Sequence, residues 1–134
     1  MKNRARAIIE DNGCVLLIHR TKSDREYWTF PGGGGEDVDA SLEDTVIREC
    51  KEELGVTVCV LGLYAEIEPT DEQTHCEFFF RCTIESGVVG SGTGPEFSRD
   101  LDESGTYEPQ WVPKRALSSM TVFPYSIKES LWRE

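Results

Sequence analysis

The sequence predicts an α/β fold, a sandwich of helices and a mixed β-sheet, from three observations. Apolar runs rich in β-branched residues recur along the chain and are separated by turn residues, a pattern typical of strands. One long amphipathic segment in the first half has helical periodicity, and a shorter one closes the chain. The 134 residues contain no internal repeat and no linker, so we expect a single domain spanning residues 1–134.

The predicted strands lie before and after the long helix in sequence. The first two are joined by Asn12-Gly13, a strong hairpin signal, and a charged loop is expected over 21–26. Residues 87–105 form the longest irregular stretch, a length typical of functional or mobile loops. The expected strands cover residues 5–9, 14–19, 27–30, 56–67, 75–86 and 107–112, followed by a helical turn opened by Pro113 and a closing helix over 124–132.

The long helix is predicted to begin after Ser41 and to end at Gly55. Ser41 and Asp44 have the spacing of a capping box, and Gly55 lies where a left-handed C-terminal cap belongs. The apolar stripe of this helix is formed by Leu42, Val46, Cys50 and Leu54. Three acids fall within an arc of about 100° that borders the stripe, namely Glu49, Glu52 and Glu53.

Three like charges at this spacing repel one another unless a positive group joins them. Carboxylate oxygens without histidine or thiolate suit a hard divalent cation, so we expect Mg²⁺, with Mn²⁺ possible, rather than zinc. Mg²⁺ in turn usually accompanies a phosphorylated substrate. The alternative for this helix alone is a solvated acidic face in an acidic protein.

Composition narrows the class of partner. The formal net charge of −11 opposes binding to a long nucleic acid but does not exclude a nucleotide whose phosphates are neutralised by a metal. The five cysteines are odd in number and form no Cys-x-x-Cys pair, which indicates free thiols in a reducing compartment. No segment is apolar and long enough for a signal core or a membrane span, so we expect a cytoplasmic protein without a membrane partner.

The glycine run after Phe30-Pro31, followed by Arg48-Glu49, Glu52-Glu53 and Gly55-Val56, resembles the Nudix box, Gly-x5-Glu-x7-Arg-Glu-U-x-Glu-Glu-x-Gly-U, where U is a bulky apolar residue. The resemblance implies the Nudix fold, an α/β/α sandwich with a mixed sheet and the box as a loop–helix–loop. It also implies Mg²⁺-dependent hydrolysis of a nucleoside diphosphate linked to another moiety, by a metal-activated water. The implied ligands are Glu49, Glu52, Glu53 and a backbone carbonyl of Gly32 or Gly33.

The box has one departure from the family pattern. Counting back from Arg48, the box glutamate should be residue 40, which is Ala40. Counting forward from the glycines, the two loop acids of the family would be Glu36 and Asp39, so we infer a one-residue insertion after Asp39. Asp39 is therefore predicted to replace the missing glutamate and is included among the metal ligands; the alternative is that this ligand is lost.

The resemblance leaves the general base and the substrate open. Glu49 or Glu53 would lie closest to the metal, and Glu96, in the long loop, resembles the distant carboxylate that some relatives use. Arg48 is grouped with these catalytic residues, although it is expected to pin a carboxylate rather than contact substrate. Five aromatic residues could supply a base-stacking wall, although most are expected in the core: Tyr27, Trp28, Phe78, Phe80 and Trp111.

Candidate substrates implied by the resemblance are a nucleoside triphosphate, ADP-ribose or a nucleotide sugar. ADP-ribose hydrolases of the family tend to carry a proline at a set distance beyond the box, and Pro69, which lies slightly nearer, gives a weak indication of ADP-ribose. The rival hypotheses are a non-catalytic nucleotide-binding or metabolite-binding module, motivated by Ala40, and a structural or interaction protein with an acidic surface. A monomer and a homodimer are equally compatible with the sequence.

Overall fold

The computed structural model describes residues 3–70, 75–90 and 105–134. The strands are β1 (Arg4–Asp11), β2 (Cys14–Lys22), β3 (Arg25–Thr29), β4 (Gly32–Gly34), β5 (Val56–Ile67), β6 (Glu77–Gly87) and β7 (Glu108–Pro113). The helices are α1 (Leu42–Leu54), the 3₁₀ helix η2 (Lys114–Ser119) and α3 (Tyr125–Trp132). Among the described residues, each element expected from sequence is therefore present, with boundaries shifted by a few residues.

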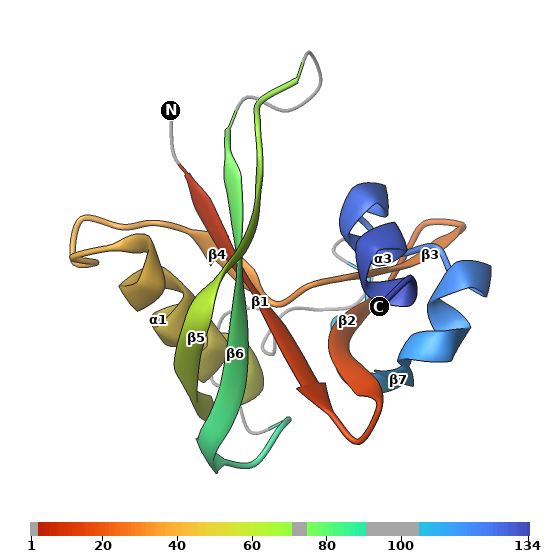
Figure 1. The fold of residues 1–134 in the computed structure, drawn as a ribbon, viewed down its shortest axis with the longest axis horizontal. Coiled ribbons are helices and arrows are strands. Elements are labelled where there is room, and N and C mark those ends of the chain that lie inside the picture. The colour runs from red at the N-terminus through yellow and green to blue at the C-terminus, as the bar shows by residue number, and fades with distance from the viewer. Residues whose placement is uncertain (1–2, 71–74, 91–104) are drawn as a thin grey trace.

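β1 is the centre of the sheet (Figure 1). It pairs antiparallel with β2 and β4 and parallel with β6, and the strand order is β3-β2-β1-β6-β5. β7 adds to β2 in antiparallel orientation. The predicted mixed sheet is thus confirmed, with its parallel pair formed by two strands that are distant in sequence.

Helices cover both faces of this sheet. Ala5, Ala7 and Ile9 point to one face and pack in a core cluster with the apolar stripe of α1. Ile8 points to the other face and packs in a second cluster with residues of η2 and α3. In Figure 1, α1 lies on one side of the central strands, while η2 and α3 lie on the other. The predicted α/β/α sandwich is confirmed.

The ends of α1 form as the sequence predicts. The Ser41 side chain accepts a hydrogen bond from the Asp44 amide at 3.1 Å, which satisfies an otherwise unpaired N–H of the first turn. Gly55 adopts a left-handed conformation with φ of 79°, and its amide donates to the Lys51 carbonyl. These caps fix the length of α1 and therefore the positions of its three acids.

Two predictions about the first half of the chain need correction. Residues 21–26 are not a loop: β2 continues to Lys22 and β3 begins at Arg25, so only Ser23 and Asp24 turn. The glycine run, which falls in the first loop of the expected loop–helix–loop, contributes β4, which pairs with β1 in the register Ala5↔Gly33. In both cases, pairing with a neighbouring strand outweighs the local preference of charged residues and glycines for loops.

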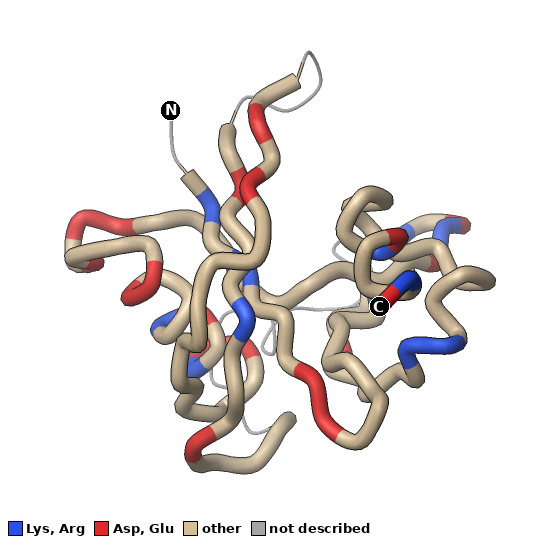
Figure 2. Tube along the Cα trace, viewed as in Figure 1, with Lys and Arg blue, Asp and Glu red and all other residues tan. Residues whose placement is uncertain are grey.

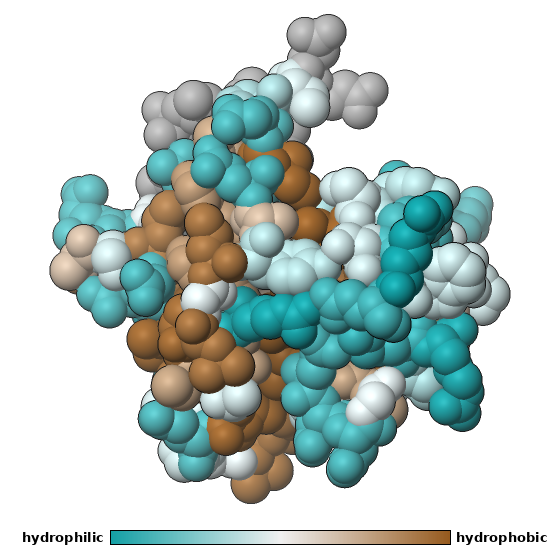
Figure 3. Space-filling model, in the orientation of Figure 1, coloured by the Kyte–Doolittle hydropathy of each residue, from teal (hydrophilic) through white to brown (hydrophobic). Residues whose placement is uncertain are grey.

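β5 forms one edge of the sheet and exposes apolar side chains. Leu61 and Leu63 are 63% and 56% exposed, and Figure 3 shows the resulting apolar surface over β5 and the adjacent β6. Register shifts at three places along the β5–β6 pair distort this edge, an irregularity that discourages edge-to-edge pairing.

Other features of the described residues bear on the predictions from composition. All five cysteines are free, as predicted, and Cys50 and Cys82 are buried. Within the described residues, no helix combines the length and apolar character required to cross a bilayer.

Candidate active site

Arg48 connects α1 to the loop that precedes it. Its Nε donates to Asp39 Oδ1 and its Nη2 to Asp39 Oδ2, each at 3.0 Å, in a bidentate ion pair. The same Nη2 also donates to the Gly34 carbonyl at 3.0 Å. Because the guanidinium is planar and rigid, these contacts fix both the loop and the end of β4 relative to the helix. The expectation that Arg48 pins a carboxylate is confirmed.

Asp39 is held by more than Arg48. Its Oδ2 also accepts hydrogen bonds from the Thr45 hydroxyl and the Glu36 amide, both at 2.9 Å, and its side chain is 6% exposed. The hydrogen bond from Arg48, above all, lowers the pKa of Asp39 well below its ordinary value and raises that of Arg48. Asp39 is therefore ionised and anchored to the arginine of the box. Its predicted role as a metal ligand stays a prediction.

The remaining guanidinium nitrogen of Arg48 contacts three further acids. Nη1 donates to Glu52 Oε2 at 2.8 Å and to Glu49 Oε2 at 3.3 Å, and it lies 3.9 Å from Glu36 Oε1. With Asp39, four carboxylates therefore share one guanidinium. This cluster keeps a local excess of negative charge.

Glycines bring the acids of α1 against the backbone of β4. Glu53 is 2% exposed, and its Oε2 accepts a hydrogen bond from the Gly32 amide at 2.8 Å. A Cβ on Gly33 would lie 2.5 Å from Glu49 Oε2, so any side chain at this position would displace that carboxylate. Glycine is needed at position 33 because the Glu49 carboxylate occupies the space that a side chain would fill.

The chemistry of this group fits a hard divalent cation. The donors from Glu49, Glu52, Glu53 and the glycine backbone are all oxygens, which Mg²⁺ and Mn²⁺ prefer. Among the described residues, however, these acids do not place three ligand atoms within 4.8 Å of one another. Arg48 holds Glu52 while Gly32 holds Glu53, so joint binding requires side-chain rotation, which the 38% exposure of the Glu52 side chain permits.

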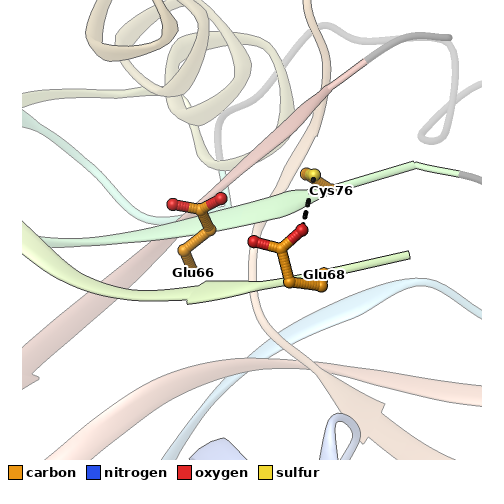
Figure 4. Close-up of side chains that lie close together, drawn as sticks. All are labelled: Glu66, Glu68 and Cys76. Atoms are coloured by element: carbon orange, nitrogen blue, oxygen red, sulfur yellow. Dashed lines mark hydrogen bonds between the residues drawn. The ribbon is translucent and has the colours of Figure 1, made fainter. Parts of the chain in front are cut away.

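A tighter group of potential ligands lies where β5 ends and β6 begins. The ligand atoms of Glu66, Glu68 and Cys76 lie within 4.8 Å of one another, and the two glutamates are exposed (Figure 4). The hydrogen bond with Glu68, above all, raises the pKa of Glu66 above its ordinary value. Both glutamates are exposed and the third group is a thiol, a soft ligand, so this group is a weaker candidate for a hard cation than the acids of α1.

The acids of α1 border a cleft of about 470 Å³, a size that suits a small molecule. Glu49, Glu53 and the three glycines of β4 line one part of this cleft. The rest is lined by Arg4, Arg6, Arg20, Tyr27, Thr29 and Tyr107. Figure 2 shows the basic start of β1 and, outside the cleft, the acidic residues of the loop that precedes α1. The cleft therefore combines carboxylates with arginines.

The arginines and Tyr107 were not predicted from sequence as site residues. The alternation of residues 4–8 contained a usable signal, since Arg4 and Arg6 must share one face of a strand whose other face carries Ala5 and Ala7. For Arg20 and Tyr107, no local pattern points to the cleft, because they reach it through strands brought together by the sheet.

Of the five aromatics considered for a base-stacking wall, Tyr27 lines the cleft. Phe80 belongs to the core cluster beneath α1, and Phe78 packs against the edge of that cluster. Trp28 packs against the core cluster on the opposite face of the sheet. Trp111 borders a different hollow, beside Glu10 and Asp11. Glu96, the predicted loop carboxylate, lies outside the described residues.

Comparisons with known proteins bear on the family and the fold. A sequence model of the NUDIX domain matches residues 1–128. A NUDIX hydrolase from Nitrosomonas europaea has a TM-score of 0.72 at 18% identity, covering 98% of this chain and 88% of that one. A structure from a study of MutT from Aliivibrio salmonicida and Vibrio cholerae has a TM-score of 0.70 at 19% identity, covering 99% and 97%.

An ADP-ribose pyrophosphatase from Streptococcus suis has a TM-score of 0.68 at 22% identity, covering 98% of this chain and 88% of that one. These identities are low, so the structural likeness shows the fold alone. A comparison with curated protein sequences finds no match. Because the NUDIX domain spans nearly the whole chain, this protein belongs to the Nudix hydrolase family, which confirms the predicted family, fold and class of enzyme.

Proposed function

We propose that this protein hydrolyses a phosphoanhydride bond in a nucleoside diphosphate linked to another moiety, with Mg²⁺ or Mn²⁺ as cofactor. One observation carries the proposal: a single cleft is lined both by Glu49 and Glu53 and by three arginines. Such a site can bind a cation at its acids and the phosphate oxygens of a substrate at the cation and the arginines. A purely structural acidic surface needs neither the cleft nor its arginines.

The residues that would hold the cation are Glu49, Glu52 and Glu53, together with the carbonyl of Gly32 or Gly33. When bound, the cation would neutralise phosphate oxygens and lower the pKa of a water molecule. Asp39 is proposed to act through Arg48, which it orients, and only secondarily as a ligand. This assignment follows from its contacts, because both of its oxygens accept hydrogen bonds from Arg48.

The chain must also supply a proton acceptor and hold the substrate. Glu49 and Glu53 both line the cleft, so either can accept the proton of the attacking water. Glu53 accepts a hydrogen bond of 2.8 Å from the Gly32 amide, whereas the contact of Glu49 with Arg48 is longer, at 3.3 Å, which favours Glu49 as the group that shifts during reaction. Glu96 remains a candidate for the same role.

The substrate is proposed at the level of its chemical class. Tyr27 and Tyr107 line the cleft and support a ring-containing moiety next to the diphosphate. Similar structures include an ADP-ribose pyrophosphatase and a UDP-X diphosphatase, in keeping with ADP-ribose, nucleotide sugars and nucleoside triphosphates as candidates. A single domain, a cytoplasmic location and a monomer or homodimer stay predictions.

The test is hydrolysis of a panel of nucleoside triphosphates, ADP-ribose and nucleotide sugars, with Mg²⁺ or Mn²⁺ and with chelator. Glu53→Gln keeps an acceptor for the Gly32 amide but removes the charge, so we expect turnover to fall at least ~100-fold. Glu43→Gln, an exposed acid in the first turn of the same helix, is the matched control and should retain turnover.

The rival function, a nucleotide-binding module without catalysis, makes the opposite prediction for this panel. It requires that no substrate is hydrolysed, while a nucleotide still raises the melting temperature. Ala40 motivated this rival, but the bidentate pair between Asp39 and Arg48 supports an assembled box and therefore favours the enzyme.

A further inference from the structure

Three arginines line one cleft of this chain, which is acidic as a whole, with 14 lysines and arginines against 25 aspartates and glutamates. The cleft is therefore richer in positive charge than the rest of the sequence. Arg4 and Arg6 come from the start of β1, and Arg20 comes from β2. Guanidinium groups concentrated in a cleft of an acidic protein indicate an anionic ligand, unless neighbouring acids already compensate them. The contacts of each arginine decide between these two cases.

Arg6 is compensated by a neighbouring acid. Its Nε lies 3.2 Å from Glu77 Oε2, and its Nη1 donates to the Phe30 carbonyl at 3.0 Å. The Glu77 side chain is largely buried, so this pair fixes β1 against β6 and the end of β3. Removing Arg6 would therefore disturb the sheet, and its charge is largely satisfied within the protein.

Arg20 is fixed in place as well. Its Nε donates to the Thr106 carbonyl at 3.0 Å, and its guanidinium lies 5.1 Å from the centre of the Tyr107 ring. These contacts join β2 to the segment that precedes β7. Arg20 can contribute charge to the cleft, but a substitution there would also loosen Tyr107.

Arg4 differs from both. Within residues 3–70, 75–90 and 105–134, its side chain has no hydrogen bond or ion pair, including none with Glu49 or Glu53. Its backbone is nevertheless fixed, since its amide donates to the Cys76 carbonyl at 2.9 Å and its register partner in β4 is Gly34. Arg4 is thus a cation whose backbone is fixed by the sheet. It pairs with β4, the strand of glycines that lies against Glu49 and Glu53.

We propose that Arg4 forms a metal-independent anion site, which binds a phosphate group of the substrate in the cleft that Glu49 and Glu53 also line. Its identification with substrate phosphate rests on the proposed function, whereas anion binding itself does not. The site predicts that a diphosphate binds before or without the cation, held by Arg4 against the repulsion of the two acids. Arg4 then contributes to the binding of substrate and takes no part in the chemical step.

The experiment is a calorimetric titration of inorganic pyrophosphate into the protein with chelator present, at low ionic strength. We expect Arg4→Gln to weaken binding about tenfold or more, because a charge-assisted contact is lost, and Arg4→Lys to retain part of it. Arg115→Gln makes the same change of charge at an exposed position of η2, outside the cleft, and should match wild type. Glu53→Gln should bind pyrophosphate more tightly than wild type, because repulsion is relieved.

Two results would overturn the anion site: no metal-free binding of pyrophosphate by wild type, or equal binding by wild type and Arg4→Gln. Equal melting temperatures of the Arg4 variants and wild type would show that folding is not the cause of weakened binding. In the hydrolysis assay, Arg4→Gln should raise KM with little change in kcat.

The two proposals can fail separately. Hydrolysis by wild type, with pyrophosphate binding unchanged in Arg4→Gln, would remove the anion site and keep the enzyme. Pyrophosphate binding that depends on Arg4, without hydrolysis of any substrate in the panel, would keep the anion site and remove the enzyme.

Discussion

Two clusters of charged residues in this protein differ in their balance of charge. Around Glu134, the side chains of two acids face those of two bases: Lys114 lies 2.7 Å from Glu10 and 3.0 Å from Glu134, and Arg81 pairs with the same two acids. Around Arg48, one base faces four acids, and buried Glu53 lies close by on the same helix. The first cluster is neutral, whereas the second is strongly negative.

This difference separates a structural contact from a candidate binding site. A neutral ion cluster needs nothing further, and the one around Glu134 ties the C-terminus to β1, β6 and η2. A cluster with excess negative charge loses stability through repulsion, and a bound cation would offset that loss. The predictions below test whether the two clusters differ in this way.

The largest effect is expected from Arg48→Gln. The substitution leaves Asp39 nearly buried without its counter-charge, so the free energy of unfolding should fall by about 3–5 kcal/mol. Turnover should be lost too, because the loop and acids lose their common anchor. Chemical denaturation and the hydrolysis assay measure the two effects.

Arg81→Gln is the comparison from the neutral cluster. It should cost only about 1 kcal/mol and leave turnover intact, because its partners are partly exposed and retain Lys114. An equal loss of turnover in both variants would contradict the division between the clusters.

The next largest effects are expected from alanine substitutions at two adjacent glycines of β4, which should differ in whether turnover or stability is lost. Gly33→Ala places a Cβ against the Glu49 carboxylate, a flexible group, so turnover should fall sharply with a modest loss of stability. Gly32→Ala places a Cβ 2.1 Å from the Ala5 carbonyl oxygen at a φ of +151°, so it should disrupt the β1–β4 pairing and unfold more easily. Melting temperatures and turnover of the two variants, measured together, check this order. A Gly33→Ala variant with normal turnover would exclude a catalytic position for Glu49.

The smallest effect is a pH dependence at the C-terminus. The hydrogen bond from Arg81, above all, lowers the pKa of Glu134 from an ordinary 4.5 to about 2. Its contribution to stability is therefore fully present above pH 4.5 and is lost as the pH falls through about 2. Glu134→Gln should lower the free energy of unfolding by about 1 kcal/mol or less at pH 7, and the difference from wild type should vanish near pH 2. A difference that grows on acidification would refute the direction of this shift.

The sequence predicted one of these clusters and not the other, for a physical reason. The acids of α1, Arg48, Ser41 and Gly55 lie close together along the chain, and the period of one helix suffices to place them on one side. The cluster around Glu134 joins residues from four distant segments, and only the folded sheet brings them together. β4 and the arginines of the cleft escaped prediction for the same reason, since they depend on the pairing partners of β1.

The most direct test of the account is titration of Mg²⁺ or Mn²⁺ into wild type, Glu53→Gln and Glu134→Gln, followed by calorimetry and by melting temperature. The account predicts that wild type and Glu134→Gln bind the cation alike and are stabilised by it, whereas Glu53→Gln binds it much more weakly. Equal binding by Glu53→Gln and wild type, or loss of binding in Glu134→Gln, would contradict the assignment of the metal centre to the acids of α1.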